Sequence, residues 1–407
     1  MTPSRVLYLQ SGGPTAVVNA SAQGVIEAAR HAGVSLCAAR HGLTGLRQGK
    51  LLDLDAVPQQ QWQQLSTLPG TCFGSSREML PPFDTAPDTW HQLRHVLCGA
   101  GIGTVLLNGG NGSMATALRL TEFGQRLDYP LRVIGIPKTI DNDLVATHFS
   151  PGYPSAAKYL AASVRELALD VTSLGPGRVL LLETMGRNTG WLAAGCAAAA
   201  RHAGEAPHLL LLPEVPYQPE RLLDALDVCL RQHGHALLVV AEGLRYGNSV
   251  LLAEQPYFPH SRFQQLGGAA QRVAAYLTQQ RSLHAHVAVA DCLQRAARHL
   301  VSALDLRLAQ QVGRTALEWA MQEQSGVMVG LSPTTGKEDW DMIAVPLADV
   351  ADAERLLPAS FIGVDGFSVS PAFLDYLRPL LQGEAWPPFA DGLPAYPSLH
   401  WPILRWR

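Results

Sequence analysis

The stretch Arg132-Val-Ile-Gly-Ile-Pro-Lys-Thr-Ile-Asp-Asn-Asp143 decides how we interpret the chain. Its apolar residues 133–136 predict a buried β-strand that ends at Pro137. The residues that follow supply a cation, a hydroxyl group and two carboxylates: Lys138, Thr139, Asp141 and Asp143. Because open α/β sheets bind ligands at the carboxyl ends of their strands, this order favours a functional site.

In an extended backbone, Asp141 and Asp143 would point to one side and Asn142 to the other. One carboxylate could then accept a proton while the other helps to hold a metal ion. The alternative is a solvated turn whose aspartates cap a helix, since Asp is common at both places. The stretch alone leaves both interpretations open.

The composition is that of a globular protein, with 47% hydrophobic residues, 16% charged residues and a net charge of −3. A chain of 407 residues is too long for one ordinary core, so we expect two domains. Its Lys and Arg residues are scattered, which argues against nucleic-acid and membrane-surface partners. The apolar runs are too short for a membrane span or a signal-peptide core. The six cysteines form no CxxC pair, so we expect reduced thiols in a cytoplasmic protein.

Two other predicted strands end in glycine turns that open a helix. Residues 6–9 precede Gly12 and Gly13, and residues 104–107 precede the segment 109–113, Gly-Gly-Asn-Gly-Ser. Such turns let the backbone approach a ligand, and the amino end of a helix attracts anions. Ser113 could cap the second helix. Neither turn is a GxGxxG or a GxxxxGK[ST] motif, and a purely structural glycine turn is the alternative.

Residues 70–77 are small and hydroxylated and end in Arg77, whose guanidinium group suits phosphate binding, although a surface arginine is the alternative. The second half predicts strands at residues 178–183, 208–214, 236–241, 287–290 and 327–330. Helices are predicted at residues 192 to about 202 and about 300–324. This alternation predicts an α/β fold with mostly parallel sheets. Glu242 follows a strand end, as a ligand contact or a helix cap would.

These motifs, in this order, resemble the phosphofructokinase family, and within it the pyrophosphate-dependent branch. The matching segments are residues 11–21, 70–77, 109–113, 137–143, 183–187, 241–243 and 293–295. The resemblance covers essentially the whole chain. It implies an α/β protein of two Rossmann-like three-layer domains, with the active site in the cleft between them. Residues 1–154 plus about 294–345 would bind the phosphoryl donor. Residues from about 155 to 293 plus 346–407 would bind the sugar phosphate and form a C-terminal extension.

The resemblance also implies a reaction, the Mg²⁺-dependent transfer of a phosphoryl group to the 1-hydroxyl of fructose 6-phosphate in glycolysis or gluconeogenesis. Asp141 would be the catalytic base with Lys138 and Thr139 beside it, and Asp143 and Asn111 would bind the metal. The donor, pyrophosphate or ATP, would be held by Gly12, Gly13, Arg77, Gly110, Asn111, Gly112 and Ser113. The acceptor would contact Thr139, Asp141, Arg178, Met185, Gly186, Arg187, Glu242, His286 and Arg295. Arg178 matches a family arginine that reaches a neighbouring subunit's ligand, so a homodimer or homotetramer is implied.

Several positions depart from the family pattern. Asn111 stands where the family has Asp, which removes a charge from the metal site. Gly112 is the residue of ATP users, whereas Lys138 is that of pyrophosphate users, so the donor is open with pyrophosphate favoured. His286 and Asp291 replace the usual Arg and Gly, which makes the acceptor pocket less cationic. Two alternatives therefore stay open: a kinase for another sugar or polyol, and a catalytically impaired binding or regulatory homologue.

Overall fold

The computed structural model describes residues 4–247, 249–253, 266–335 and 339–406. The chain divides into two compact units. Unit 1 comprises Met1–Gly152, Ala303–Glu354 and Glu384–Arg407, and unit 2 comprises Tyr153–Ser302 and Arg355–Gly383.

Unit 1 is built on a seven-stranded sheet with the strand order β11-β10-β5-β4-β1-β2-β3. Five neighbouring strands are parallel: β10 (Val327–Pro333), β5 (Arg132–Pro137), β4 (Ile102–Gly109), β1 (Arg5–Gln10) and β2 (Leu36–Ala39). The two edge strands are antiparallel to their neighbours: β11 (Trp340–Pro346) and β3 (Leu51–Asp53). The chain runs from β1 outward in one direction and from β4 outward in the other, so the topological switch point lies between β1 and β4.

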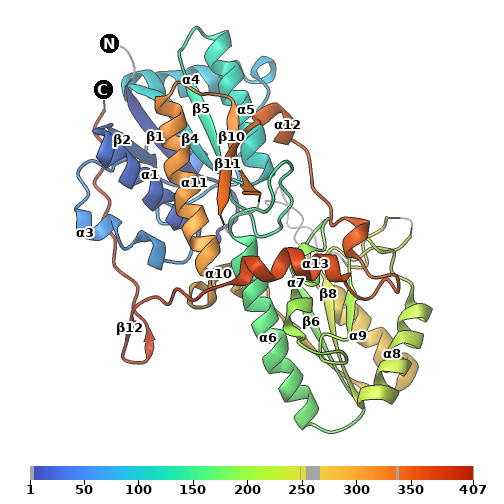
Figure 1. Ribbon diagram of the computed structural model, residues 1–407. Helices are drawn as coiled ribbons and strands as arrows, with labels where there is room; N and C mark the ends of the chain where they lie inside the picture. Colours follow the sequence, from blue (N-terminus) through green and yellow to red (C-terminus); the bar gives the residue numbers. More distant parts are fainter. Residues whose placement is uncertain (1–3, 248, 254–265, 336–338, 407) are drawn as a thin grey trace. The chain divides into compact units, whose positions relative to one another are not determined.

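Helices cover both faces of this sheet, which makes unit 1 a three-layer structure (Figure 1). One face carries α1 (Val18–Ala32) and α11 (Ala303–Met321), and the other carries α4 (Pro87–Gly99) and α5 (Asn111–Arg126). Leu7, Leu9, Val105 and Leu107 alternate along their strands and pack with buried side chains of α4 and α5. Shorter helices complete the unit: α2 (Gly42–Arg47), α3 (Gln59–Trp62) and α12 (Leu347–Val350).

Unit 2 contains a four-stranded parallel sheet in the order β7-β8-β6-β9. Its strands are β6 (Arg178–Thr184), β7 (Leu209–Leu211), β8 (His235–Ala241) and β9 (His284–Val289). Its principal helices are α6 (Tyr153–Ser173), α8 (Pro219–His233) and α9 (Ala269–Arg281). Side chains of α8 and α9 pack with alternate residues of β6 and β8, among them Val179 and Leu238, while α6 contacts the same strands. The predicted fold class, α/β with mostly parallel sheets, is therefore confirmed.

The unit boundaries differ from the predicted division. Residues 294–302 belong to unit 2, whereas residues 346–354 and 384–407 belong to unit 1. The C-terminal segment joins unit 1 because its side chains bond there: Trp401 Nε1 donates to the carbonyl of Cys72 at 3.0 Å, and Trp406 Nε1 to that of Gly49 at 2.9 Å. Earlier in the same segment, the chain forms a hairpin of two short strands, β12 (Phe389–Ala390) and β13 (Leu393–Pro394).

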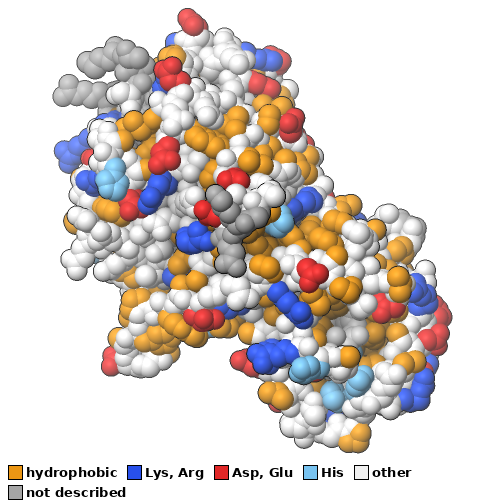
Figure 2. All heavy atoms as spheres, viewed as in Figure 1, with side chains coloured by type: hydrophobic (Ala, Val, Ile, Leu, Met, Phe, Trp, Pro, Cys, Tyr) orange, Lys and Arg blue, Asp and Glu red, His pale blue; other side chains and the backbone are white. Residues whose placement is uncertain are grey.

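The predicted alanine-rich helix is shorter than expected. It consists of α7 (Trp191–Gly195) and a 3₁₀ turn (Cys196–Ala199). The remaining short helices of unit 2 are α10 (Leu293–Ala296) and α13 (Pro371–Leu377). Within the described part of the chain, every helix is too short or too polar to cross a bilayer. On the face that Figure 2 shows, Lys and Arg side chains lie among acidic and apolar ones rather than in one basic patch.

Candidate active site

Three loops meet at the carboxyl edge of the unit 1 sheet, at its topological switch point. The strand register places Gln10 opposite Asn108 and Gly109 opposite Pro137, so β1, β4 and β5 end side by side. Backbone bonds extend this pairing into the loops, because the Ser11 N–H donates to the Asn108 carbonyl at 2.9 Å and the Lys138 N–H to the Gly109 carbonyl at 3.0 Å. The sequence therefore brings two glycine turns and the lysine–aspartate segment to one place.

Lys138 lies against the first glycine turn. Its side chain is 3% exposed, and its Nζ donates to the Gly13 carbonyl at 2.6 Å. Gly12 has φ +77°, and a Cβ at Gly12 would lie 3.5 Å from the same Nζ. Glycine is thus required by the left-handed backbone, and it leaves the ammonium group directly over the turn. A buried ammonium group at a glycine turn is a candidate site for a small anion.

Two buried amides that no sequence motif singles out hold residues 68–73 against this turn. Gln10 Nε2 donates to Asn19 Oδ1 at 3.1 Å, and Gln10 Oε1 accepts the Phe73 N–H at 3.2 Å. Asn19 accepts the Cys72 N–H at 3.0 Å. An asparagine among the apolar positions of a helix was the available signal, since buried polar side chains need partners.

The segment before Arg77 is bonded to the same glycine turn. The Gly12 N–H donates to the Ser76 carbonyl at 3.0 Å, and Ser75 Oγ donates to the Gly12 carbonyl at 2.7 Å. Arg77 itself is exposed at the end of this segment. The backbone thus places Arg77 beside the turn, and its binding of a donor stays a prediction.

The second glycine turn leads into α5 and contacts the lysine segment. A Cβ at Gly110 would lie 3.5 Å from the Lys138 carbonyl oxygen and 3.7 Å from Thr139 Cβ. Gly110 rather than Ser113 is the residue before the helix, so the predicted Ser113 cap is wrong. A Cβ at Gly112 would meet nothing within 4 Å among the described residues, so this position offers room for a larger ligand.

Asn111 and Asp143 come together from two of these loops. Asn111 Nδ2 donates to Asp143 Oδ2 at 2.9 Å. Asp141 and Asp143 do not lie on one extended strand as predicted, because Asn142 has a left-handed backbone with φ 55°. The Asn142 side chain is fully buried and its Oδ1 accepts the Ser150 N–H at 2.9 Å, which stabilises that bend. The bend turns Asp143 toward Asn111.

The Asn111–Asp143 pair offers oxygen ligands of the kind that Mg²⁺ prefers. Asn111 Oδ1 and Asp143 Oδ1 are both buried, and neither accepts a hydrogen bond from any described residue. Burial, and then the nearby charge of Asp141, raises the pKa of Asp143 to about 7. A cation would satisfy both oxygens and favour the ionised carboxylate. No group of three or more His, Cys, Asp and Glu side chains in the described ranges is arranged to hold a metal. A metal here would therefore depend on further ligands from a bound phosphate, as Mg²⁺ commonly does.

Thr139 is the link between the lysine and Asp141. Its side-chain Oγ1 accepts the Asp141 N–H at 3.0 Å, and its own N–H donates to the Pro151 carbonyl at 3.2 Å. Thr139 is 8% exposed, whereas Asp141 is more accessible. These two hydrogen bonds hold the backbone at Thr139, so Asp141 can keep one orientation.

In unit 2, the predicted acceptor residues gather at the carboxyl ends of β6 and β8. The Glu242 N–H donates to the Thr184 carbonyl at 2.9 Å, and the Gly243 N–H to the Gly186 carbonyl at 3.1 Å. Burial raises the pKa of Glu242. These bonds bring Glu242 beside the turn that carries Met185, Gly186 and Arg187.

Gln294 extends this unit 2 group to Arg295. Its side chain is 1% exposed, its Oε1 accepts the Met185 N–H at 3.3 Å, and its Nε2 donates to the Asp291 carbonyl at 2.9 Å. Arg295 follows directly, with its Nη2 3.1 Å from Cys292 Sγ. In the sequence, Gln294 is distinguished only by its place in the segment 293–295. The structure shows that it joins the two halves of the group.

Arg178 and His286 lie elsewhere in unit 2. Arg178 begins β6, seven residues before Met185, and His286 pairs with Leu180 in the first half of that strand. At about 3.3 Å per residue, Arg178 is about 20 Å along the strand from Met185. Within one chain, therefore, these two residues lie apart from Met185 and the turn that carries it.

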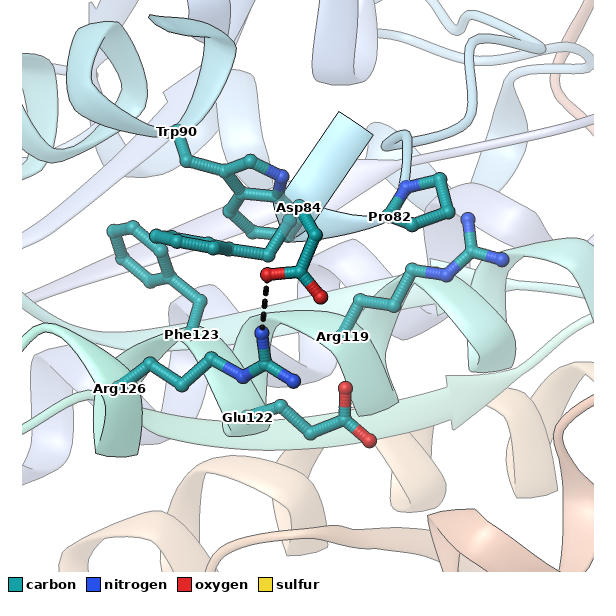
Figure 3. Close-up of a pocket in the computed structure, with 8 residues that line it drawn as sticks. Pro82, Asp84, Trp90, Arg119, Glu122, Phe123 and Arg126 are labelled. Carbon is teal, nitrogen blue, oxygen red and sulfur yellow. Dashed lines mark hydrogen bonds and ion pairs between the residues drawn. The ribbon is translucent and has the colours of Figure 1, made fainter. Parts of the chain in front are cut away.

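A separate pocket of about 140 Å³ lies near the carboxyl half of α5 (Figure 3). Phe83, Trp90 and Phe123 form its apolar wall, and Asp84 bonds Arg126 across its mouth at 3.3 Å. Since a helix rises about 1.5 Å per residue, Glu122 in this pocket is about 16 Å along α5 from Asn111. The pocket is thus distinct from the loops described above.

Comparisons with known proteins identify the family of the chain. The family model described as "Phosphofructokinase" matches residues 5–320. A protein of Methylococcus capsulatus named pyrophosphate–fructose 6-phosphate 1-phosphotransferase is 39% identical over 98% of this chain and 96% of its own. A protein of Alkalicoccus urumqiensis named sulfofructose kinase is 31% identical over 88% of this chain and 92% of its own. The crystal structure of a pyrophosphate-dependent phosphofructokinase from Nitrosospira multiformis superposes with a TM-score of 0.91, at 35% identity, over 99% of this chain and 98% of that one. The chain belongs to the phosphofructokinase family.

Proposed function

We propose that this chain transfers a phosphoryl group from pyrophosphate to the 1-hydroxyl of fructose 6-phosphate. Unit 1 binds the donor and unit 2 binds the acceptor. The observation that carries the proposal is the Lys138 ammonium group, buried and bonded to the Gly13 carbonyl at the switch point of the unit 1 sheet. The names of the relatives, which specify this donor and this acceptor, support it.

Pyrophosphate suits the charges of the donor loops. Lys138 and backbone N–H groups of the glycine turns interact with phosphate oxygens, and the guanidinium group of Arg77 adds further N–H donors. The open space at Gly112 does not exclude a nucleotide, so steric exclusion is not what selects the donor. Lys138 is the residue that favours pyrophosphate over a nucleotide, because its charge stabilises the phosphate group that leaves.

Asp141 acts as the base. It takes the proton of the sugar 1-hydroxyl as that oxygen attacks phosphorus, and the Thr139 hydroxyl holds its backbone in place. Asp143 and Asn111 would hold Mg²⁺, with further oxygen ligands from the donor. When bound, the metal supplies positive charge that neutralises the transferring phosphoryl group.

The acceptor is bound by Met185, Gly186, Arg187, Glu242 and Arg295. Arg178 and His286 reach an acceptor only from a second copy of the chain, given their distance along β6, so the active form is a homo-oligomer. A second candidate is a related sugar or polyol acceptor. Exposed His286 and Asp291 supply less positive charge than the family's Arg and Gly, and one relative carries a name for a sulfonated sugar.

An assay that crosses pyrophosphate and ATP with fructose 6-phosphate, sulfofructose and unphosphorylated sugars tests the proposal. We expect the highest kcat/KM with pyrophosphate and fructose 6-phosphate. Asp141→Asn should lower kcat by about 10²–10⁴-fold and leave acceptor affinity within a few-fold. A preference for ATP or for another acceptor would replace the corresponding part of the proposal. No turnover in any combination, with normal ligand-induced thermal shifts, would identify a binding homologue instead.

A further inference from the structure

The chain first leaves unit 1 after Gly152, and it returns at Ala303. Two residues after this return, Asp305 in the first turn of α11 is 0% exposed. Its Oδ1 and Oδ2 lie 3.0 and 3.2 Å from the Gly152 backbone nitrogen, whose N–H they accept. One buried carboxylate thus joins the two points at which the chain leaves and re-enters this unit.

Gly152 in turn packs against Thr139, which lies in the segment that carries the proposed base Asp141. It forms an isolated parallel bridge with Thr139, and a Cβ at Gly152 would lie 3.3 Å from the Thr139 carbonyl oxygen and 2.6 Å from Thr15 Cγ2. Its φ of +109° is outside the range that other residues adopt easily. Gly152 therefore has one conformation available in this place, and a bond to its N–H fixes its orientation.

Thr139 connects Gly152 to Asp141, because the Thr139 hydroxyl accepts the Asp141 N–H at 3.0 Å. The contacts form an unbroken series from α11 through Gly152 and Thr139 to the proposed base. A hydrogen bond to a charged acceptor is stronger than a neutral one, and in a buried place it is also more directional. Errors of about 1 Å in the placement of a reacting group can cost about 10²-fold in rate.

We infer that Asp305 is a positioning residue for phosphoryl transfer: it holds Gly152 and, through Thr139, sets the orientation of Asp141. This inference deepens the proposed function and rests on Asp141 as its base. Asp305 acts from the start of α11, outside the motif segments that carry the family resemblance.

Asp305→Ala should lower kcat by about 10²-fold while the affinity for pyrophosphate, measured by calorimetry, changes less than about threefold. Asp305→Asn keeps one oxygen that can accept the Gly152 N–H, so kcat should stay within about tenfold of wild type. The matched control is Glu27→Gln. Glu27 accepts bonds from Gln310 at 3.1 Å and Arg314 at 2.6 Å, so it also anchors α11 through a carboxylate, but to α1. Its variant should keep kcat within about twofold.

Hydrogen exchange gives a readout that does not depend on turnover. The Gly152 amide and neighbouring amides of residues 139–152 should exchange at least tenfold faster in Asp305→Ala than in wild type and Glu27→Gln. If wild type transfers no phosphoryl group, the proposed function fails while this measurement still tests the contact series. Unchanged exchange, or a kcat in Asp305→Ala equal to that of Glu27→Gln, would overturn the inference. If Asp305→Ala does not fold, the exchange comparison is made with Asp305→Asn, whose neutral oxygen is a weaker acceptor than the carboxylate. The Gly152 amide should then exchange at least threefold faster than in wild type and Glu27→Gln, and exchange equal to that of wild type would overturn the inference.

Discussion

The side-chain amide of Asn111 donates to the carboxylate of Asp143 across a distance of 2.9 Å, from the first residue of α5 to the loop after β5. An ionised carboxylate at position 111 could not make this bond, because it has no hydrogen to donate. It would instead bring a second negative charge to within hydrogen-bond distance of Asp143. Two unit charges about 4 Å apart interact by roughly 4 kcal/mol at an effective dielectric of about 20. The amide thus changes the metal-free site from a repulsive pair into a bonded one.

Asn111→Asp should therefore destabilise the metal-free protein and tighten Mg²⁺ binding. We expect a loss of about 1–3 kcal/mol in the free energy of unfolding at pH 8 without Mg²⁺, because a bond is lost and repulsion is added. Calorimetric titration with Mg²⁺ should show higher affinity than in wild type. Asn111→Ala is the control that removes the bond without adding charge, and it should weaken Mg²⁺ binding. Equal Mg²⁺ affinities in all three proteins would exclude this pair as the metal site.

Lys138→Met should keep the volume of the buried stem and remove the charge over the glycine turn. Loss of one preorganised donor to a reacting phosphate typically costs about 10²–10³-fold in rate, so we expect that loss in kcat with pyrophosphate. The stability of unit 1 should change little, because the Gly13 carbonyl that Lys138 bonds lies at a solvent-accessible turn. Steady-state kinetics make the measurement. Exposed Lys50→Met is the matched control, and equal kcat values in the two variants would remove Lys138 from the reaction.

Apolar strands and glycine turns were predictable because each depends on local sequence. The runs at residues 6–9, 104–107 and 133–136 had to be buried, and their turns had to lie at one edge of a parallel sheet. The approach of Lys138 to Gly13 follows from that topology. The bond between Asn111 and Asp143 does not, since it depends on the left-handed backbone at Asn142, for which the sequence offered no pattern.

Contacts between residues far apart in the chain account for most of what sequence reasoning missed. Asp305 and Gly152 are 153 positions apart, and neither stands in a motif that suggests the other. Trp401 packs on Phe73 with ring centroids 4.6 Å apart, although the tail was assigned to the other domain. Nothing in the sequence of the tail indicated which core its aromatic side chains complete.

Trp401→Ala should destabilise unit 1 by about 2–3 kcal/mol, because it removes the ring contact with Phe73 and the bond to the Cys72 carbonyl. Trp401→Phe keeps a ring and loses only the bond, so about 1 kcal/mol is expected. Chemical denaturation monitored on unit 1 provides the values. Trp386→Ala, in the same tail but 59% exposed, should stay within about 0.5 kcal/mol of wild type. An equal effect of both Trp→Ala changes would show that the tail contributes in a non-specific way.

Three histidines of unit 2 lie close together, and protonation of one of them, His208, opposes folding. The His208 ring lies 4.9 Å from that of His233 and 5.4 Å from that of His235. His208 Nδ1 accepts the Leu237 N–H at 3.0 Å, which requires an unprotonated nitrogen. Burial, followed by the charges of His233 and His235, lowers the pKa of His208 to about 4.

Because the pKa of His208 is lower in the folded chain than in the unfolded one, the unfolded state binds the proton more readily. The stability associated with neutral His208 is therefore complete above about pH 6.5 and is lost as the pH falls from there toward 4. We expect a loss of about 1–2 kcal/mol over this window, after allowance for solvent screening of a partly exposed ring. His208→Asn supplies an acceptor for Leu237 that does not titrate, so its denaturation free energy should fall less between pH 7 and pH 4.5 than that of wild type. Exposed His31→Asn is the control and should follow the wild-type curve. Identical slopes for wild type and His208→Asn would mean that His208 does not carry this pH dependence.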